Sequence, residues 1–176
     1  IRDIGVTGVQ TCALPILNGK TVTMLGNSFN ADTITIAAYI LYNLVYAAGS
    51  YPMGMLADRF SFRKVIIFGF LVFAGVYAGF AFVNSIPIIF LLFGIYGLYA
   101  AATEGVIKAW ITNLSQHSDT ATAVGFYTSC ESICTLLASV IAGAIWTNSG
   151  SAATFLCTAL ITLIVCIYFV LLSRKR

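Results

Sequence analysis

Charge is scarce in this sequence. Only 9% of its 176 residues are charged, whereas 60% are hydrophobic and the mean hydropathy is +0.96. Soluble globular domains carry about 25% charged residues, so a chain this apolar would expose large sticky patches in water. The composition therefore excludes a soluble globular fold. The net charge of +3 does not indicate a nucleic-acid-binding surface either, because the basic residues lie at the ends of apolar runs, where such residues set membrane orientation.

Patterns that support catalysis or metal binding are also missing. The sequence has a single histidine, His117 in a polar stretch, and neither an HExxH motif nor a pair of aspartates. No apolar run combines a serine or cysteine nucleophile with a histidine. Four of the five cysteines lie in apolar runs, where cysteine behaves as a small buried hydrophobe, without the polar ligands and loop typical of a zinc site. We therefore expect a protein that is not an enzyme and holds no metal or cofactor.

Long apolar runs are what the sequence has instead. A transmembrane helix needs about 20 predominantly apolar residues, and several runs approach that length. The five expected spans cover about residues 33–52, 65–82, 88–111, 123–146 and 152–172. Pro52 and Gly54 are expected to end the first span, and Thr147 to Gly150 to form the turn between the last two. The predicted fold class is all-α, a polytopic transmembrane helical bundle.

The first 32 residues are expected to lie outside this bundle. Residues 6–16 resemble the conceptual translation of a sequencing-library adapter, so we expect residues 1–16 to be adapter-derived and the protein to be truncated here. They lack a basic start and a long apolar core, which argues against a signal peptide. Residues 17–32 are polar, with glycine and asparagine side by side, and this composition predicts an extracytoplasmic loop.

A group of charges separates the first two spans. The stretch contains Gly54, Asp58, Arg59, Arg63 and Lys64 in the pattern Gly-x-x-x-Asp-Arg-x-x-x-Arg-Lys. This pattern resembles the signature loop of the major facilitator superfamily (MFS) of secondary transporters. In that family the loop joins the second and third helices and, in a looser copy, the eighth and ninth. Ser61 stands where the family usually has a second glycine, which fits the looser copy.

The resemblance implies a mechanism and a role for these charges. MFS transporters bind a small solute near the bilayer midplane, between two six-helix halves that rock to expose it alternately to either side. Asp58 is then implied to be a conformational latch that holds the N-terminus of a helix in the opposite half. Arg59 and Arg63 are implied to hold the loop and to contact anionic lipid headgroups. The alternative is that these charges, with Lys64, only set the membrane topology.

Two motifs that the later spans lack indicate which half of such a transporter the chain resembles. In the family's first half, the helix two after the loop usually has an embedded arginine, and the next helix a glycine–proline motif. Residues 88–111 contain no arginine and residues 123–146 no proline. The resemblance therefore favours helices eight to twelve of the C-terminal half, with the missing N-terminal half as a partner. In the family helices eight, ten and eleven border the cavity, whereas nine and twelve are peripheral.

The first, third and fourth spans carry polar groups that we expect to face this cavity. The candidates are Tyr39, Asn43, Tyr46, Glu104, Lys108 and Glu131. A charge in hydrocarbon costs about 2.5–3.5 kcal/mol on insertion scales, and Glu104 and Lys108, four residues apart on a helix, are expected to offset each other. Lys108 either snorkels to the membrane surface or belongs to the cavity. Glu131 is either a protonated structural carboxyl or a group that couples transport to a proton or cation.

The positions of the basic residues predict the topology. If the five spans alternate in direction, six basic residues fall on one side: Arg59, Arg63, Lys64, Arg174, Lys175 and Arg176. Only Lys20 lies on the other side once residues 1–16 are set apart, and the positive-inside rule then places the C-terminus in the cytoplasm. We expect a multi-pass cell-membrane protein in contact with lipid, a secondary active transporter of a small solute coupled to a proton or cation. The alternative is a polytopic membrane protein without transport activity, such as a sensor or an assembly factor.

Overall fold

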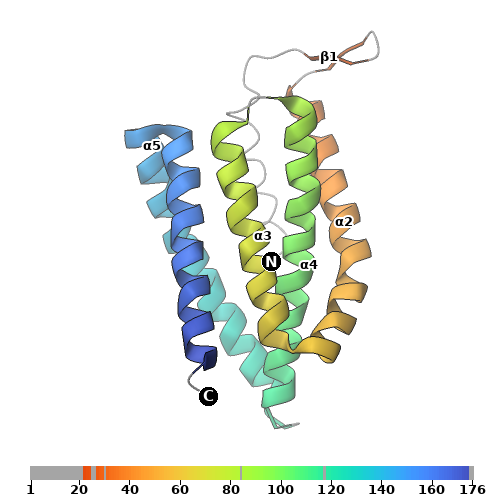
Figure 1. Ribbon diagram of the computed structural model, residues 1–176, viewed down its shortest axis with the longest axis vertical. Coiled ribbons are helices and arrows are strands. Elements are labelled where there is room, and N and C mark those ends of the chain that lie inside the picture. The colour runs from red at the N-terminus through yellow and green to blue at the C-terminus, as the bar shows by residue number, and fades with distance from the viewer. Residues whose placement is uncertain (1–21, 25–26, 30, 84, 117, 175–176) are drawn as a thin grey trace.

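The computed structural model describes residues 22–24, 27–29, 31–83, 85–116 and 118–174 (Figure 1). Its elements are the strands β1 (Val22–Met24) and β2 (Asn27–Phe29) and the helices α2 (Ala31–Phe60), α3 (Phe62–Phe82), α4 (Ile86–Leu114) and α5 (Thr120–Arg174). All four helices of the described chain are long and apolar enough to cross a membrane. Apart from the antiparallel β1–β2 hairpin, this part of the chain is the helical bundle that the composition predicts.

The predictions for the N-terminal 32 residues fall largely outside the residues that the structure describes. Residues 1–16, the segment that resembles an adapter, lie outside the described residues, as does part of the predicted loop 17–32. Within that loop the structure describes the hairpin, in which Val22 pairs with Phe29, and the start of α2 at Ala31. The extracytoplasmic position of this segment stays a prediction.

The first helix is longer than the sequence suggests. The prediction that Pro52 and Gly54 end it is wrong, because α2 continues to Phe60 with Pro52 inside it. A proline within a helix removes one backbone hydrogen bond and bends the helix, and neighbouring turns can carry the helix past it. Figure 1 shows the last turns of α2 running across the end of the bundle toward the start of α3. Asp58 and Arg59 are therefore helical residues and not members of a loop.

Ser61 alone connects α2 to α3. Its φ of 128° and ψ of 134° lie in a region that a Cβ atom makes unfavourable and that glycine adopts freely. The signature pattern usually has a glycine at this position, and the backbone conformation supplies a reason for it. Strain of this kind costs about 1–3 kcal/mol per residue.

Replacing Ser61 with glycine is expected to stabilise the protein by about 1 kcal/mol, because the strain at the α2–α3 junction would be released. Thermal unfolding of the intact protein in detergent measures the effect. Ser85, whose φ of −97° is ordinary, provides the matched control: Ser85→Gly should not raise the unfolding temperature. An unchanged or lowered unfolding temperature for Ser61→Gly would show that the junction is not strained.

The chain reverses direction within α5. Its 55 residues would extend about 80 Å as one straight helix at about 1.5 Å per residue, whereas the hydrocarbon core of a bilayer is about 30 Å thick. Gly150 interrupts the helix with φ 84° and ψ 175°, a conformation open essentially to glycine alone. Figure 1 shows the two parts of α5 lying antiparallel. The predicted turn is thus confined to Gly150, and we call residues 120–149 the first segment of α5 and residues 151–174 the second.

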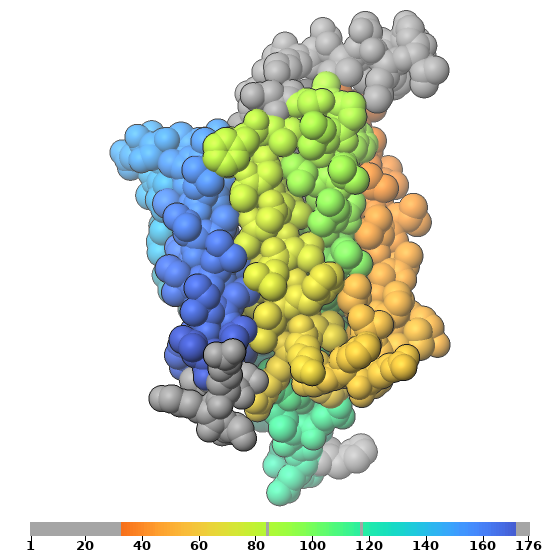
Figure 2. All heavy atoms as spheres, viewed as in Figure 1, coloured from red at the N-terminus to blue at the C-terminus, as the bar shows by residue number. Residues whose placement is uncertain are grey.

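Three helices and the second segment of α5 enclose two apolar cores. Phe80, Phe93 and Phe155, from α3, α4 and α5, meet in the core toward the hairpin. The other core lies near the α2–α3 junction and includes Ala57 and Val106. In the face shown in Figure 2, α3 and α4 fill the middle, between α5 and α2.

The first segment of α5, in contrast, leaves most of its apolar surface open. Its exposed large side chains are Phe126, Ile133, Leu136, Leu137, Val140 and Ile141. An apolar surface of this extent marks a contact with lipid or with further protein. This segment is therefore the part of the described bundle with the least cover from its own chain.

Helices α2 and α4 approach closely at Gly97. A Cβ atom built on Gly97 would lie 2.6 Å from the carbonyl oxygen of Tyr42 and 3.2 Å from the backbone nitrogen of Tyr46. One turn along, a Cβ on Gly49 would lie 3.1 Å from the Cβ of Ala101. Small residues at such positions let two membrane helices pack backbone against backbone. The contact places the tyrosines of α2 directly beside α4.

Candidate functional site

Tyrosine rings form a continuous stack between α2 and α4. Tyr42 lies 6.1 Å from Tyr39 and 6.2 Å from Tyr46 between ring centroids, since the three residues are about one helical turn apart. Across the helix contact, the ring of Tyr42 lies 5.4 Å from Tyr96, which lies 5.4 Å from Tyr99. We call these five rings the tyrosine stack. The sequence predicts the row on α2 from its helical spacing, but not its continuation onto α4.

Two glutamates on different helices lie within electrostatic range of this stack. Glu104 of α4 acts on Tyr46 of α2. The hydroxyl of Tyr127, on the first segment of α5, donates to Oε1 of Glu131 at 3.5 Å. Both carboxylates act electrostatically on Tyr99 and on Tyr127, and both side chains are exposed.

Asn43 and Lys108, which the sequence also predicts to face the cavity, make no contact with the tyrosine rings that the structure shows. The side-chain amide of Asn43 donates to the carbonyl oxygen of Tyr39, 2.8 Å away in its own helix. The ion pair expected between Glu104 and Lys108 does not form, and within the described residues neither glutamate pairs with a basic side chain. Lys108 is half-buried and lies one turn closer to the C-terminal end of α4. Within the described part of the chain, Glu104 and Glu131 thus have no basic partner.

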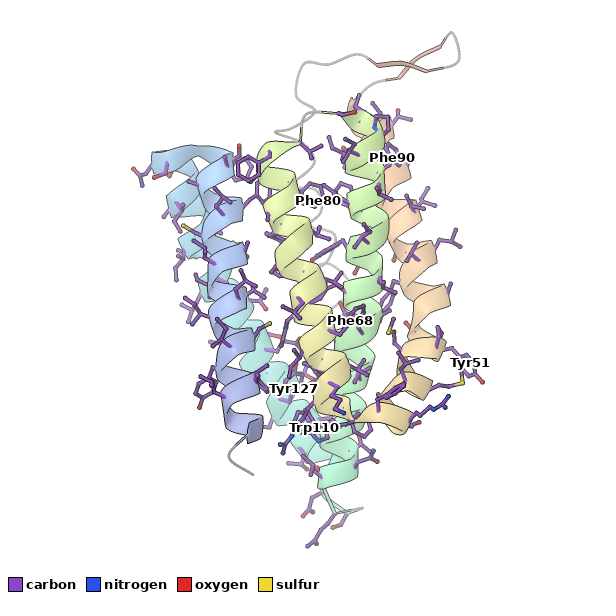
Figure 3. All side chains as sticks on the ribbon, in the orientation of Figure 1. Tyr51, Phe68, Phe80, Phe90, Trp110 and Tyr127 are labelled. Atoms are coloured by element: carbon purple, nitrogen blue, oxygen red, sulfur yellow. The ribbon has the colours of Figure 1, made fainter. Side chains whose placement is uncertain are left out.

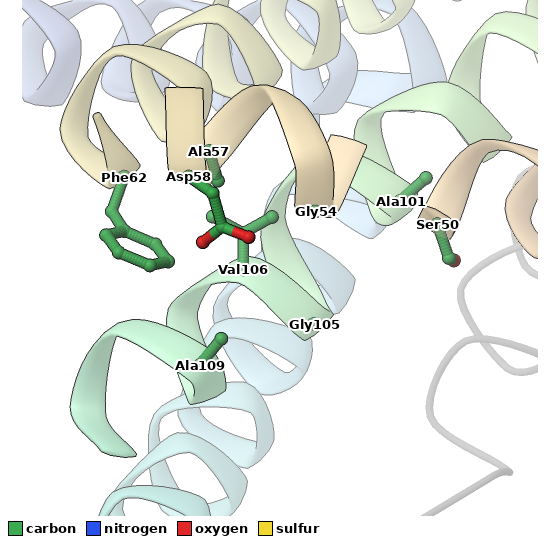
Figure 4. A pocket seen from close by; sticks show the side chains of 9 residues that line it. All are labelled: Ser50, Gly54, Ala57, Asp58, Phe62, Ala101, Gly105, Val106 and Ala109. Carbon is green, nitrogen blue, oxygen red and sulfur yellow. The ribbon is translucent and has the colours of Figure 1, made fainter. Parts of the chain in front are cut away.

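Asp58 lines a groove between α2 and α4, near the α2–α3 junction (Figure 4). The groove has a volume of about 250 Å³. Its walls are made mostly of small side chains: Ser50, Gly54, Ala57, Ala101, Gly105 and Ala109. Figure 4 shows the carboxylate of Asp58 beside Val106, with Phe62 at one end. Because the residues that line the groove are small, another backbone segment has room to approach the exposed carboxylate of Asp58.

Arg63 joins the start of α3 to the end of α4. Its guanidinium carbon lies 5.7 Å from the centroid of the Trp110 ring, which is within the range of a cation–π interaction. Trp110 also packs against the core near the junction, and Figure 3 shows it in the half of the bundle that contains this junction. Trp110 was not predicted from the sequence. A tryptophan close to the end of an apolar run, where aromatic residues gather at membrane surfaces, was the available signal.

The comparison with known families decides what kind of protein this is. The chain matches the model of the Major Facilitator Superfamily over residues 8–176. The chain belongs to the major facilitator superfamily. It is accordingly a multi-pass membrane protein, and the family predicted from the sequence is confirmed.

Two curated relatives are also MFS-type transporters. An uncharacterised MFS-type transporter of Methanocaldococcus jannaschii is 37% identical over 131 residues, which cover 74% of this chain and 33% of the relative. An uncharacterised MFS-type transporter of Schizosaccharomyces pombe is 26% identical over 177 residues, 99% of this chain and 39% of the relative. This MFS chain therefore spans between a third and two fifths of the length of these relatives. No solved structure matches it.

The MFS signature residues lie on two helices at one end of the bundle. Gly54, Asp58 and Arg59 belong to the last turns of α2, whereas Arg63 and Lys64 belong to the first turn of α3. Arg59 lies over the ring of Phe60, its own neighbour, at 5.8 Å. Of the signature residues, all of which the structure describes, Arg63 alone joins two helices of this MFS chain through a cation–π contact. Among the described residues, no three histidine, cysteine or acidic side chains could hold a metal ion together.

Replacing Arg63 with glutamine is expected to destabilise this MFS protein by about 0.5–1 kcal/mol, the usual strength of an exposed cation–π interaction. The change removes the contact between α3 and Trp110 of α4. Thermal unfolding of the intact protein measures it. Arg59→Gln is the matched control, since Arg59 contacts only a residue of its own helix. Equal shifts for the two variants would contradict a specific role for the Arg63–Trp110 contact.

Proposed function

We propose that this chain is part of a secondary active transporter that moves a small solute across the cell membrane by alternating access, coupled to a proton or another cation. The proposal is based on two carboxylates on different helices, Glu104 and Glu131, that lie within electrostatic range of the same tyrosines; among the described residues, neither forms an ion pair with a basic side chain. A charged side chain inside a membrane costs about 2.5–3.5 kcal/mol and faces a cavity or another helix when it persists. Both carboxyl groups therefore suit a water-filled path for solute and coupling ion.

The reversal at Gly150 supports a count of five membrane-crossing segments in this proposal. They are α2, α3, α4 and the two segments of α5, which run in alternating directions in Figure 1. Five is one short of a six-helix MFS half, and we assign them to helices eight to twelve. The open apolar surface of the first segment of α5 would then be covered by the remaining helix of this half and by the N-terminal half.

The ends of the helices suggest an orientation. The α2–α3 junction, with its basic residues, and the C-terminal end of α5 lie at the same end of the bundle in Figure 1. Basic residues are enriched on the cytoplasmic side of membrane proteins. We therefore propose that this end of the protein faces the cytoplasm.

Asp58 is proposed to be a latch between the two halves. The small walls of its groove would admit the first turn of a helix, whose free N–H groups and dipole stabilise a carboxylate by about 0.3–1 kcal/mol, and by about 2 kcal/mol where it is partly buried. Such a contact can form in only one of the two orientations of the halves. Asp58 would thereby stabilise that orientation relative to the other.

Replacing Asp58 with asparagine in the intact transporter is expected to shift the balance between inward-open and outward-open states by a factor of about five, the equivalent of about 1 kcal/mol. The amide keeps the size of the side chain but loses its charge. Accessibility of a cavity residue from each side of the membrane measures the balance, and solute flux in vesicles measures the activity. Unchanged accessibility would contradict the latch. Absence of any solute flux driven by an ion gradient would instead favour a sensor or an assembly factor.

A further inference from the structure

Two exposed cysteines lie one helical turn apart on the first segment of α5. Cysteines in the apolar runs were predicted to be buried, and Cys166 is buried, but the prediction is wrong for Cys130 and Cys134, whose thiols are free and exposed. Neither thiol has a hydrogen-bond partner within the described residues. Both thiols are therefore available to a ligand that approaches from outside the described bundle.

Regular helix geometry places the two thiols next to each other. Within the described residues of α5, Gly150 is the one with non-helical backbone angles, so residues 130 and 134 both belong to regular helix. Residues four apart on a helix are neighbours, with their Cβ atoms about 5–6 Å apart. Cys134 is also about 60° around the helix from Glu131, since each residue turns the helix by about 100°. The thiol pair thus borders the side of the segment that bears Glu131.

This spacing is too wide for a disulfide but suits a bridge through one metal ion. A disulfide brings its two Cβ atoms to about 3.5–4.5 Å, which is closer than helical neighbours four residues apart. Thiolate–zinc bonds are about 2.3 Å long, so two bonds of that length to one ion hold two sulfur atoms about 4.6 Å apart. Cys130 and Cys134 can therefore share an ion without any change in the helix that carries them.

The number of ligands indicates the kind of ion. Among the described residues, no three histidine, cysteine or acidic side chains come together to hold a metal ion, so the pair has to satisfy the ion with two sulfur atoms. Structural zinc sites use four protein ligands, and Mg²⁺ and Ca²⁺ require oxygen ligands. Thiolates select soft ions such as Cu(I), which forms stable complexes with two thiolates alone.

We propose that Cys130 and Cys134 bind one Cu(I) ion between their sulfur atoms. Each thiol releases its proton to water as its sulfur binds the ion, and the oxidation states of copper and sulfur do not change. Two ligands held on one rigid element bind more tightly than either alone, by a factor of about 10²–10⁴. This site does not depend on transport, because both of its ligands belong to one helical segment of the chain.

Competition for Cu(I) with a chromogenic chelator tests this proposal on the intact, reduced protein in detergent, with oxygen excluded. We expect Cys130→Ser and Cys134→Ser each to lose one tightly bound Cu(I) ion, with the affinity at this site at least about a hundredfold lower. If the two thiols acted separately, each variant would keep the affinity of the remaining thiol, and unchanged affinity in either variant would overturn the proposal. Displacement of the Cu(I) by an equal concentration of Zn²⁺ would overturn the assignment to a soft ion.

A second pair of variants separates the spacing of the thiols from their number. Cys134→Ser combined with Thr135→Cys keeps the number of thiols but moves one of them about 100° around the helix, and we expect the lost Cu(I) ion not to return. Cys157→Ser removes a thiol of the second segment of α5 and should leave the ion bound. Tight Cu(I) binding by the Cys134→Ser, Thr135→Cys protein would contradict a site made by this pair. These readouts are binding affinities, so their failure leaves the proposed transport function intact.

Discussion

Replacing Gly97 with alanine is expected to lower the stability of the protein by about 1–3 kcal/mol, the usual effect of overpacking a tight contact. The added Cβ would meet the carbonyl oxygen of Tyr42 at 2.6 Å. A backbone atom cannot move aside as the end of a flexible side chain does, so α2 and α4 would have to separate. Separation would also shift the tyrosine stack, and we expect solute transport to fall along with stability.

Gly94→Ala is the matched control for this prediction. It lies on the same helix, about one turn earlier, and its added Cβ would come no closer than 3.9 Å to Leu41. Both substitutions add the same methyl group and raise helix propensity by the same amount. The difference in stability between the two variants therefore reports only on the contact between α2 and α4. Thermal unfolding of the intact transporter in detergent measures both. A Gly97→Ala protein as stable as Gly94→Ala would contradict close packing of α2 on α4.

Replacing Glu131 with glutamine is expected to abolish ion-coupled transport. Glutamine keeps the size of the side chain and can still accept a hydrogen bond from Tyr127, but it can neither bind a transported proton nor neutralise a cation. Glu131 acts electrostatically on Tyr127 and Tyr99, and so does Glu104. Glu104, which belongs to another helix, is therefore the described carboxyl group that could replace it.

Flux of solute into vesicles with and without an imposed pH gradient measures this effect. The natural protein should respond to the gradient, whereas Glu131→Gln should give the flux of vesicles without protein. Tyr127→Phe is the control, because it removes only the hydroxyl that donates to Glu131 and should retain coupled transport. Full, gradient-dependent transport by Glu131→Gln would remove this residue from the mechanism.

Hydropathy alone was enough to predict the helical bundle and the approximate positions of its segments. The physical reason is that lipid requires each spanning segment to satisfy its own backbone and to be apolar over its whole length. The positions of Glu104 and Glu131 on polar helix faces followed from spacing along the helix. The end of α2 could not be predicted from the sequence, because a proline such as Pro52 can either bend a helix or end it. Packing at the α2–α3 junction decides between the two.

Contacts between helices were not predictable from the sequence. The close approach of Gly97 to the backbone at Tyr42 depends on how α2 crosses α4, and many glycines in membrane helices make no such contact. Gly75, for example, has open space where a Cβ would lie. The pairing of Arg63 with Trp110 likewise joins residues that are far apart in sequence. The ion pair of Glu104 with Lys108 was expected from spacing alone, yet such a pair is weak on any helix.

We propose that the first segment of α5 turns the side that bears Glu131 toward water and not toward lipid. Cys134 lies three residues after Glu131, on the same side of the helix, and is exposed, whereas Ile164, on the second segment, is exposed among apolar neighbours. The most direct measurement is labelling of single-cysteine forms of the intact transporter with a membrane-impermeant thiol reagent. We expect the reagent to label Cys134 and to leave Ile164→Cys unmodified. Labelling of Ile164→Cys while Cys134 stays unmodified from both sides of the membrane would contradict it.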